Sequence, residues 1–247
     1  MKHLLVLAIL SAPAAWTQTL KARELFYTPP PDAAKPVATA AKKASVKPVA
    51  AKAGDTHTLS ASVPLGLRYA VLKRDANGQY NEVDPDTSFR SGDRIRLKVD
   101  ANTSGYLYVV MQGSSGTWKL LFPSAEVAGG SNLVHKGESR QIPSGDRGQF
   151  VFDEQAGNEK LFIVLTRQPE PDLDKLIYSM GGTTGGTRSL VAQAAVGDDV
   201  VSKLRNQVAS RDLVFEKVDS AENAAYVVNP STASDARLVV DVALKHK

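Results

Sequence analysis

The side chains that could support hydrolysis lie between residues 135 and 154. They are one histidine, one serine and three carboxylates, namely His135, Ser144, Asp146, Asp153 and Glu154. A hydrolase needs a nucleophile next to a base, or two carboxylates that flank a cleft. Each of these residues lies in a segment rich in glycine or proline, where an ordinary turn also explains it. A hydrolase or hydrolase accessory site that uses His135 and nearby carboxylates therefore stays as an alternative, to be decided by their positions in space.

Two other stretches have some features of ligand sites. Residues 82–88 contain Glu82, Asp84 and Asp86, but they lack the glycine and the distant glutamate of a calcium loop, so we expect a turn capped by Asp86 or Ser88. Residues 181–188 are rich in glycine, but Thr187 stands where a phosphate loop has lysine. The four histidines are scattered along the chain. The sequence predicts no metal and no cofactor.

Aromatic residues are a further candidate set. Their members are Tyr106, Tyr108, Trp118, Phe122, Phe150, Phe152 and Phe162. Packing in the core explains most of them, because each buried aromatic ring removes a large apolar area from water. An aromatic ring on an open face would instead form a platform for a carbohydrate or a peptide. Tyr106, Tyr108 and Trp118 are therefore the candidate binding residues, on the condition that they are exposed.

The elements that must position these residues are predicted to be β-strands. Residues 104–123 predict a hairpin, since residues 105–111 are apolar on both faces at period two and the glycines at 113 and 116 permit a reversal. Residues 94–99 alternate, with Ile95, Leu97 and Val99 inward and basic residues outward. Further strands are predicted at 65–73, 79–83, 132–134, 139–142, 149–152 and 159–165. Many short strands with turn signals favour an antiparallel β-sandwich or open barrel.

The last third of the chain has a different pattern. Residues 172–179 and 198–208 are predicted as helices, and residues 213–218, 225–228 and 237–244 as three closing strands. We expect these strands to dock on the same sheet, within a single β-rich domain over residues 57–247. Residues 181–247 form its C-terminal helix and closing strands.

The first residues resemble an export signal. Residues 1–17 combine a basic start, an apolar run from Leu4 to Leu10 and small residues after it, which is the layout of a secretory signal peptide. Neither this run nor any later one is long enough to span a bilayer. The chain has no cysteine, which excludes a disulfide framework, a thiol nucleophile and the acylated cysteine of a lipoprotein. We expect an exported protein, periplasmic or extracellular.

Residues 18–56 are predicted to be an amphipathic segment followed by a disordered linker. Residues 20–27 are amphipathic, and the stretch after them is rich in proline, alanine and lysine. Its lysines could touch an anionic envelope surface, but a solvated spacer is the better explanation for them. The formal charge is +4, and losing Lys2 with the signal leaves 4 − 1 = +3. This near balance does not favour nucleic acid as a partner.

Several of these segments together carry a family resemblance. They are Leu67-Arg68-Tyr69, residues 89–97, residues 105–109, Leu121-Phe122-Pro123, Ile142-Pro143 and residues 161–165. In this order they resemble the domain of unknown function 4384 family, over roughly residues 65–180. Members of that family look like bacterial proteins, often exported or associated with the envelope. The resemblance implies an accessory or recognition role and assigns no catalytic residue.

Together these observations favour one reading of the function. We expect an exported, non-enzymatic β-sandwich that binds a protein or polymer partner of the bacterial cell envelope. The signal, the linker, the β-rich body and the weakness of each catalytic set motivate this expectation. A third possibility is that residues 20–27 pair with a partner while the folded body serves as a scaffold.

Overall fold

The computed structural model describes most of the chain after residue 62 and one short segment before it. The described residues are 21–28, 63–113, 116, 118–123, 131–145, 148–174, 195–196, 199, 201–202, 205–206, 213–218 and 222–247. The predicted signal and nearly all of the predicted linker lie outside them. The glycine-rich stretch at 181–188 and Asp146 also lie outside them.

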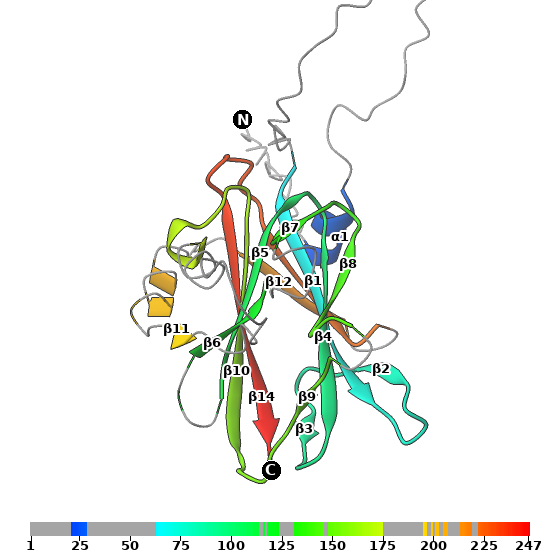
Figure 1. Ribbon diagram of the computed structural model, residues 1–247. Coiled ribbons are helices and arrows are strands. Elements are labelled where there is room, and N and C mark those ends of the chain that lie inside the picture. Colours follow the sequence, from blue (N-terminus) through cyan, green and yellow to red (C-terminus); the bar gives the residue numbers. More distant parts are fainter. Residues whose placement is uncertain are drawn as a thin grey trace, which may run out of the picture.

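Two sheets face each other in these residues (Figure 1). We call them sheet A and sheet B. Sheet A has the order β12 (Val214–Val218), β13 (Ala224–Asn229), β1 (Leu65–Arg74), β4 (Arg94–Ala101) and β8 (Ser139–Ile142), and in addition β2 (Tyr80–Val83) pairs with β1 and β9 (Phe150–Val151) with β4. Sheet B has the order β11 (Ala195–Val196), β6 (Trp118–Phe122), β5 (Gly105–Gln112), β10 (Gly157–Thr166), β14 (Arg237–His246) and β3 (Ser88–Phe89), with β7 (Leu133–Val134) on β5. The fold is mainly β and sandwich-like, as the sequence predicts.

The core lies between the two sheets. The inner faces of β1 and β4 supply alternate apolar residues, such as Leu67 on β1 and Leu97 on β4. Sheet B supplies the matching set from β5, β10 and β14, including Leu107, Ile163 and Val240. A strand whose two faces differ in polarity turns its apolar face inward. The predicted inward direction of Ile95, Leu97 and Val99 is confirmed.

The predicted hairpin at residues 104–123 is the centre of sheet B. β5 pairs antiparallel with β6, with a register irregularity between Val109 and Val110, and it pairs with β10 on its other side. The outer face of β5 is also covered, because Tyr108 and Val110 join a second apolar cluster with Trp118 and Phe162. Gly105 is required here, since a Cβ at this position would lie 2.7 Å from the carbonyl oxygen of Thr166.

The three closing strands form where the sequence predicts them, but they do not join one sheet. β12 and β13 extend sheet A beside β1, whereas β14 pairs with β10 in sheet B. The expectation of a common sheet was wrong because alternation identifies a strand without naming its neighbour. Residues 171–174 are helical, and so are the described residues 199, 201, 202, 205 and 206. The rest of the two predicted helices lies outside the described residues.

The buried Tyr69 on β1 is expected to make the fold less stable as the pH rises above 10. Its side chain faces the core and is 4% exposed, and burial, reinforced by Asp86 and opposed by Lys217, raises its pKa to about 12. An unfolded tyrosine ionises near pH 10, so the folded chain holds this proton between pH 10 and 12 while the unfolded chain releases it. The contribution is therefore complete below pH 10 and is lost as the pH rises to 12, by about 3 kcal/mol.

Urea unfolding at intervals between pH 9 and 12 measures this effect. We expect the unfolding free energy of Tyr69→Phe to fall less steeply with pH than that of the unsubstituted protein. Equal slopes would contradict the assignment to Tyr69.

Candidate functional site

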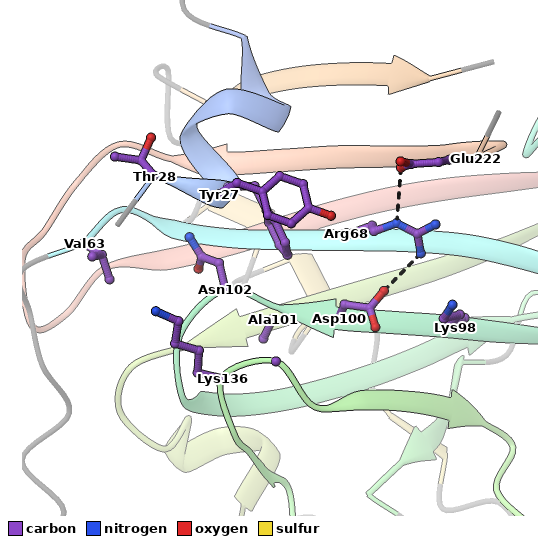
Figure 2. Close-up of a pocket in the computed structure, with 12 residues that line it drawn as sticks. Tyr27, Thr28, Val63, Arg68, Lys98, Asp100, Ala101, Asn102, Lys136 and Glu222 are labelled. Carbon is purple, nitrogen blue, oxygen red and sulfur yellow. Dashed lines mark hydrogen bonds and ion pairs between the residues drawn. The ribbon is translucent and has the colours of Figure 1, made fainter. Parts of the chain in front are cut away.

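A pocket of about 630 Å³ lies on the outer face of sheet A, beside the helix α1 (Ala22–Tyr27). We call it the α1 pocket. The end of α1 forms one wall, β1 and β4 form the floor, and the loop between β7 and β8 closes another side (Figure 2). Its lining residues are Phe26, Tyr27, Thr28, Val63, Arg68, Lys98, Asp100, Ala101, Asn102, Lys136, Gly137 and Glu222.

The helix α1 is held by its contacts with sheet A. An isolated helix of six residues is unstable in water, so tertiary contacts must supply its stability. Ala22 and Phe26 lie one turn apart and are buried on β13, where the Phe26 ring meets Tyr226 edge to face at a centroid distance of 5.3 Å. Arg23 forms an ion pair of 2.7 Å with Glu222. The amphipathic character predicted for residues 20–27 thus serves an intramolecular contact.

Gly66 on β1 permits this close packing. A Cβ at Gly66 would lie 2.8 Å from Asn102 Nδ2 and 3.0 Å from the Phe26 ring. Instead the Gly66 amide donates a hydrogen bond of 2.7 Å to Asn102 Oδ1, and Asn102 Nδ2 donates to the carbonyl oxygen of Pro64 at 3.1 Å. The Asn102 side chain is therefore fixed in the wall of the pocket.

Arg68 is the central charge of the floor. Its side chain is 10% exposed and contacts three carboxylates, with N–O distances of 2.9 Å to Glu82, 3.0 Å to Asp100 and 3.8 Å to Glu222. Burial alone would lower the pKa of the guanidinium, but hydrogen bonds and the charge of Glu82, together with Tyr226 and Asp100, outweigh it and raise the pKa. Arg68 is therefore a permanent cation that orders the surrounding carboxylates (Figure 2).

A chain of hydrogen bonds connects this floor with α1. Tyr226 donates to Glu222 Oε2 at 2.6 Å, and the hydroxyls of Tyr27 and Tyr226 lie 3.2 Å apart. Burial first, and then Glu222 and Tyr27, raise the pKa of Tyr226, so its hydroxyl stays protonated at neutral pH. The helix, the floor and their carboxylates therefore form one connected polar network.

The backbone hydrogen-bonding groups of the two floor strands, β1 and β4, are already paired with neighbouring strands. β1 is paired with β13 and β4 on its two sides, and β4 with β1 and β8. A ligand in the α1 pocket therefore has to be recognised through side chains, because these strands have no free edge there.

The described residues of the hydrolase alternative do not come together. Gly137, next to the His135 turn, donates to Ala101 at one end of β4, whereas Phe152, next to Asp153 and Glu154, donates to Asp93 at the other end. The interval from Asp93 to Ala101 is 101 − 93 = 8 residues, or about 26 Å along a strand. Glu138 is the carboxylate beside His135, and it accepts from the His135 amide and pairs with Arg140.

The other described members of that alternative make no shared site either. Asp153 and Glu154 are exposed, and the Ser144 hydroxyl donates to the carbonyl oxygen of Gln141. The described residues therefore contain no site that joins His135 with Ser144, Asp153 or Glu154.

The aromatic candidates are mostly buried. Tyr108 is 0% exposed and Trp118 is 3% exposed, and both belong to the apolar cluster on the outer face of sheet B. The Tyr108 hydroxyl donates to Asp174 and accepts from the Glu170 amide, and burial raises its pKa. Tyr106 is partly buried against the same cluster. Tyr108 and Trp118 thus do not meet the exposure that a binding platform needs, because packing uses their rings.

The carboxylates at residues 82–88 bind basic side chains. Asp84 and Asp86 both contact Lys217 Nζ, at 2.8 and 2.7 Å, and Glu82 contacts Arg68 and Lys98. The turn is capped by Asp84, which accepts from the Asp86 amide, and not by Asp86 or Ser88 as the sequence suggested.

In the part of the chain that the structure describes, no group of three or more His, Asp or Glu side chains is placed to hold a metal ion. No helix among those residues is long and apolar enough to cross a membrane.

The part of the chain from β3 to β10 carries all but one of the segments on which the family resemblance depends, because Leu67-Arg68-Tyr69 lies on β1. Residues 88–169 match the family model of the domain of unknown function DUF4384. The expected family is confirmed over this range, which is narrower than the expected 65–180 and excludes β1. No curated protein and no solved structure matches the chain. The DUF4384 match contributes Lys98, Asp100, Ala101, Asn102, Lys136 and Gly137 to the α1 pocket, and residues outside the match contribute the remaining lining.

The α1 pocket was not found from the sequence. Arg68 does have a local signal, since it is the one charged residue in the apolar run from Leu65 to Leu72. Its pairing with Asp100 depends on the register of β1 and β4, and its contact with Glu222 joins residues far apart in the chain. Tyr27 belongs to a segment recognised as amphipathic, but the sequence does not show which surface that segment covers.

Proposed function

We propose that this protein is an exported, non-enzymatic binding module of the bacterial cell envelope, and that the α1 pocket is its binding site for a protein or polymer partner. The pocket itself carries the proposal. It has the volume of a ligand site, it is partly open to solvent, and its polar side chains converge from α1, sheet A and a loop.

The chemistry of the lining supports binding in preference to catalysis. Its two carboxylates, Asp100 and Glu222, are held in ion pairs around Arg68, which suits orientation of a ligand. The signal-like residues 1–17 and the linker composition support export to the envelope.

A retention assay tests the proposed function. The purified protein is incubated with a bacterial envelope fraction and pelleted, and the bound fraction is measured. We expect Phe26→Ala to lower retention several-fold, because Phe26 anchors the helix wall of the pocket. Phe215→Ala is the matched control, since Phe215 is 57% exposed and does not line the pocket.

Retention that is absent, or equal in Phe26→Ala and the unsubstituted protein, would overturn the choice of site. Mass spectrometry of the envelope material after incubation tests whether the protein is non-enzymatic. Release of new soluble products would contradict that part of the proposal. Cell fractionation of the chain with and without residues 1–17 addresses export.

A further inference from the structure

We propose that the α1 pocket binds a sugar that carries a carboxylate, in a segment about the size of a disaccharide. This inference rests on the proposed function, because it takes the α1 pocket as the binding site. Tyr27 supplies a ring face for the sugar, Lys136 meets its carboxylate, and Asp100 and Glu222 accept hydrogen bonds from its hydroxyls (Figure 2).

The paired floor favours a sugar over a peptide. An extended peptide is commonly recognised by adding a strand to a free sheet edge. β1 and β4 are paired on both sides and offer no such edge in the pocket. The lining instead presents carboxylate acceptors beside guanidinium and ammonium donors, and sugar hydroxyls can both donate and accept.

Tyr27 is placed as an aromatic platform. Its side chain is 62% exposed, although its neighbour Phe26 is buried. The ring is held in position by the edge-to-face contact with Phe26 at 5.0 Å and by the Tyr226 hydroxyl at 3.2 Å. A fixed ring with one open side gives apolar surface to the C–H groups of a pyranose while its polar end stays bonded.

Lys136 is the cation most available to a ligand. Arg68 is surrounded by three carboxylates, and Lys98 contacts Glu82 at 3.2 Å. Among the described residues, no carboxylate forms an ion pair with the Lys136 side chain. The backbone amide of Lys136 donates a hydrogen bond of 3.2 Å to the Ser104 hydroxyl, which holds this part of the loop in place. The lining contains three basic residues, Arg68, Lys98 and Lys136, against two acidic ones, Asp100 and Glu222. Glu82, which lies outside the lining, neutralises one of these positive charges through its contacts with Arg68 and Lys98, so the preference for an anionic ligand depends on Lys136.

A sugar in this position contacts α1 and sheet A together. A ligand that binds only the docked arrangement stabilises it by mass action. Bound ligand therefore strengthens the docking of α1 and slows tryptic cleavage at Lys21 and Arg23. At saturating ligand, this protection reports on the docking of α1 and is a structural readout besides the measured affinity.

Calorimetric titration of the purified protein tests the proposal. The acidic probes are the disaccharide of N-acetylglucosamine and N-acetylmuramic acid, and digalacturonate, which separate an amino-sugar source from a uronic acid source. The comparators are neutral diacetylchitobiose and the acidic dipeptide Ala-Glu. We expect at least one acidic disaccharide to bind about tenfold more tightly than either comparator, as one charge-assisted contact implies.

Variants assign this preference to residues. Lys136→Met is expected to abolish the preference for the acidic disaccharide, whereas Lys160→Met, an exposed lysine on β10 in sheet B, leaves it unchanged. Tyr27→Ala is expected to weaken the binding of both acidic and neutral sugars. It should also remove the ligand-dependent protection of Lys21 from trypsin.

Three results would overturn the inference: equal affinity for acidic and neutral sugars, a preference that survives Lys136→Met, or tighter binding of the dipeptide. In each of these cases envelope retention that depends on Phe26 would still support the proposed function. Loss of that dependence is the separate result that removes the pocket as the site.

Discussion

Phe162→Ala is expected to lower the unfolding free energy by about 3–5 kcal/mol. Phe162 lies on the outer face of β10 and is 0% exposed. Its ring meets Trp118 at a centroid distance of 6.2 Å and belongs to the cluster that contains Tyr108. Truncation removes the buried apolar area and leaves a cavity that its neighbours can fill only in part.

Urea unfolding followed by tryptophan fluorescence measures this loss. Phe215→Ala removes the same side chain from an edge strand where it is 57% exposed, so we expect a change of at most about 0.5 kcal/mol. A small effect of Phe162→Ala, equal to that of Phe215→Ala, would show that the outer face of sheet B is not a packed core. In that case Tyr108 and Trp118 would return as candidate binding residues.

The strands of the fold were predictable because each carries its own local signal. The alternation of residues 94–99 identifies β4, and the Asp-Ala-Asn-Gly sequence at 75–78 identifies the turn between β1 and β2, where Gly78 has a φ of 84°. The partners of the closing strands were not predictable. β13 is apolar on both faces and β14 alternates, but neither pattern indicates which sheet the strand joins. Strand identity is a local property, whereas strand pairing is set by contacts over long sequence separations.

The candidate site was harder to predict for the same reason. Tyr106, Tyr108 and Trp118 have the residue types of a binding platform, but their exposure depends on what covers sheet B. His135 and Asp153 are close in sequence and lie near opposite ends of β4. Conversely, Arg68, Asp100 and Glu222 meet only because β1, β4 and the residues before β13 are adjacent in space. Closeness in the sequence therefore selected residues that do not form a site, and it missed residues that meet only in the folded chain.

Arg68→Met is expected to lower the unfolding free energy by about 3 kcal/mol. The substitution keeps much of the side-chain volume but leaves the carboxylates of Glu82, Asp100 and Glu222 without their shared cation, at side-chain exposures of 23%, 20% and 28%. Partly buried like charges then repel one another and lose hydrogen bonds. The control is Arg94→Met. Arg94 is exposed and lies on the same face of β4 as Asp100, so we expect its substitution to change the unfolding free energy by at most about 0.5 kcal/mol.

The double variant Arg68→Met/Asp100→Asn distinguishes charge pairing from lost packing. If unpaired carboxylates cause the loss, neutralising Asp100 should restore part of the stability, and the two substitutions should couple by about 1–3 kcal/mol in a double-mutant cycle. Chemical denaturation of the four proteins of the cycle at neutral pH gives the coupling. Strict additivity would mean that Arg68 stabilises the fold through its aliphatic packing, and its ion pairs would then contribute little to ordering the α1 pocket. A measured coupling would instead support Arg68 as the residue that holds the carboxylates of the floor in position for a ligand.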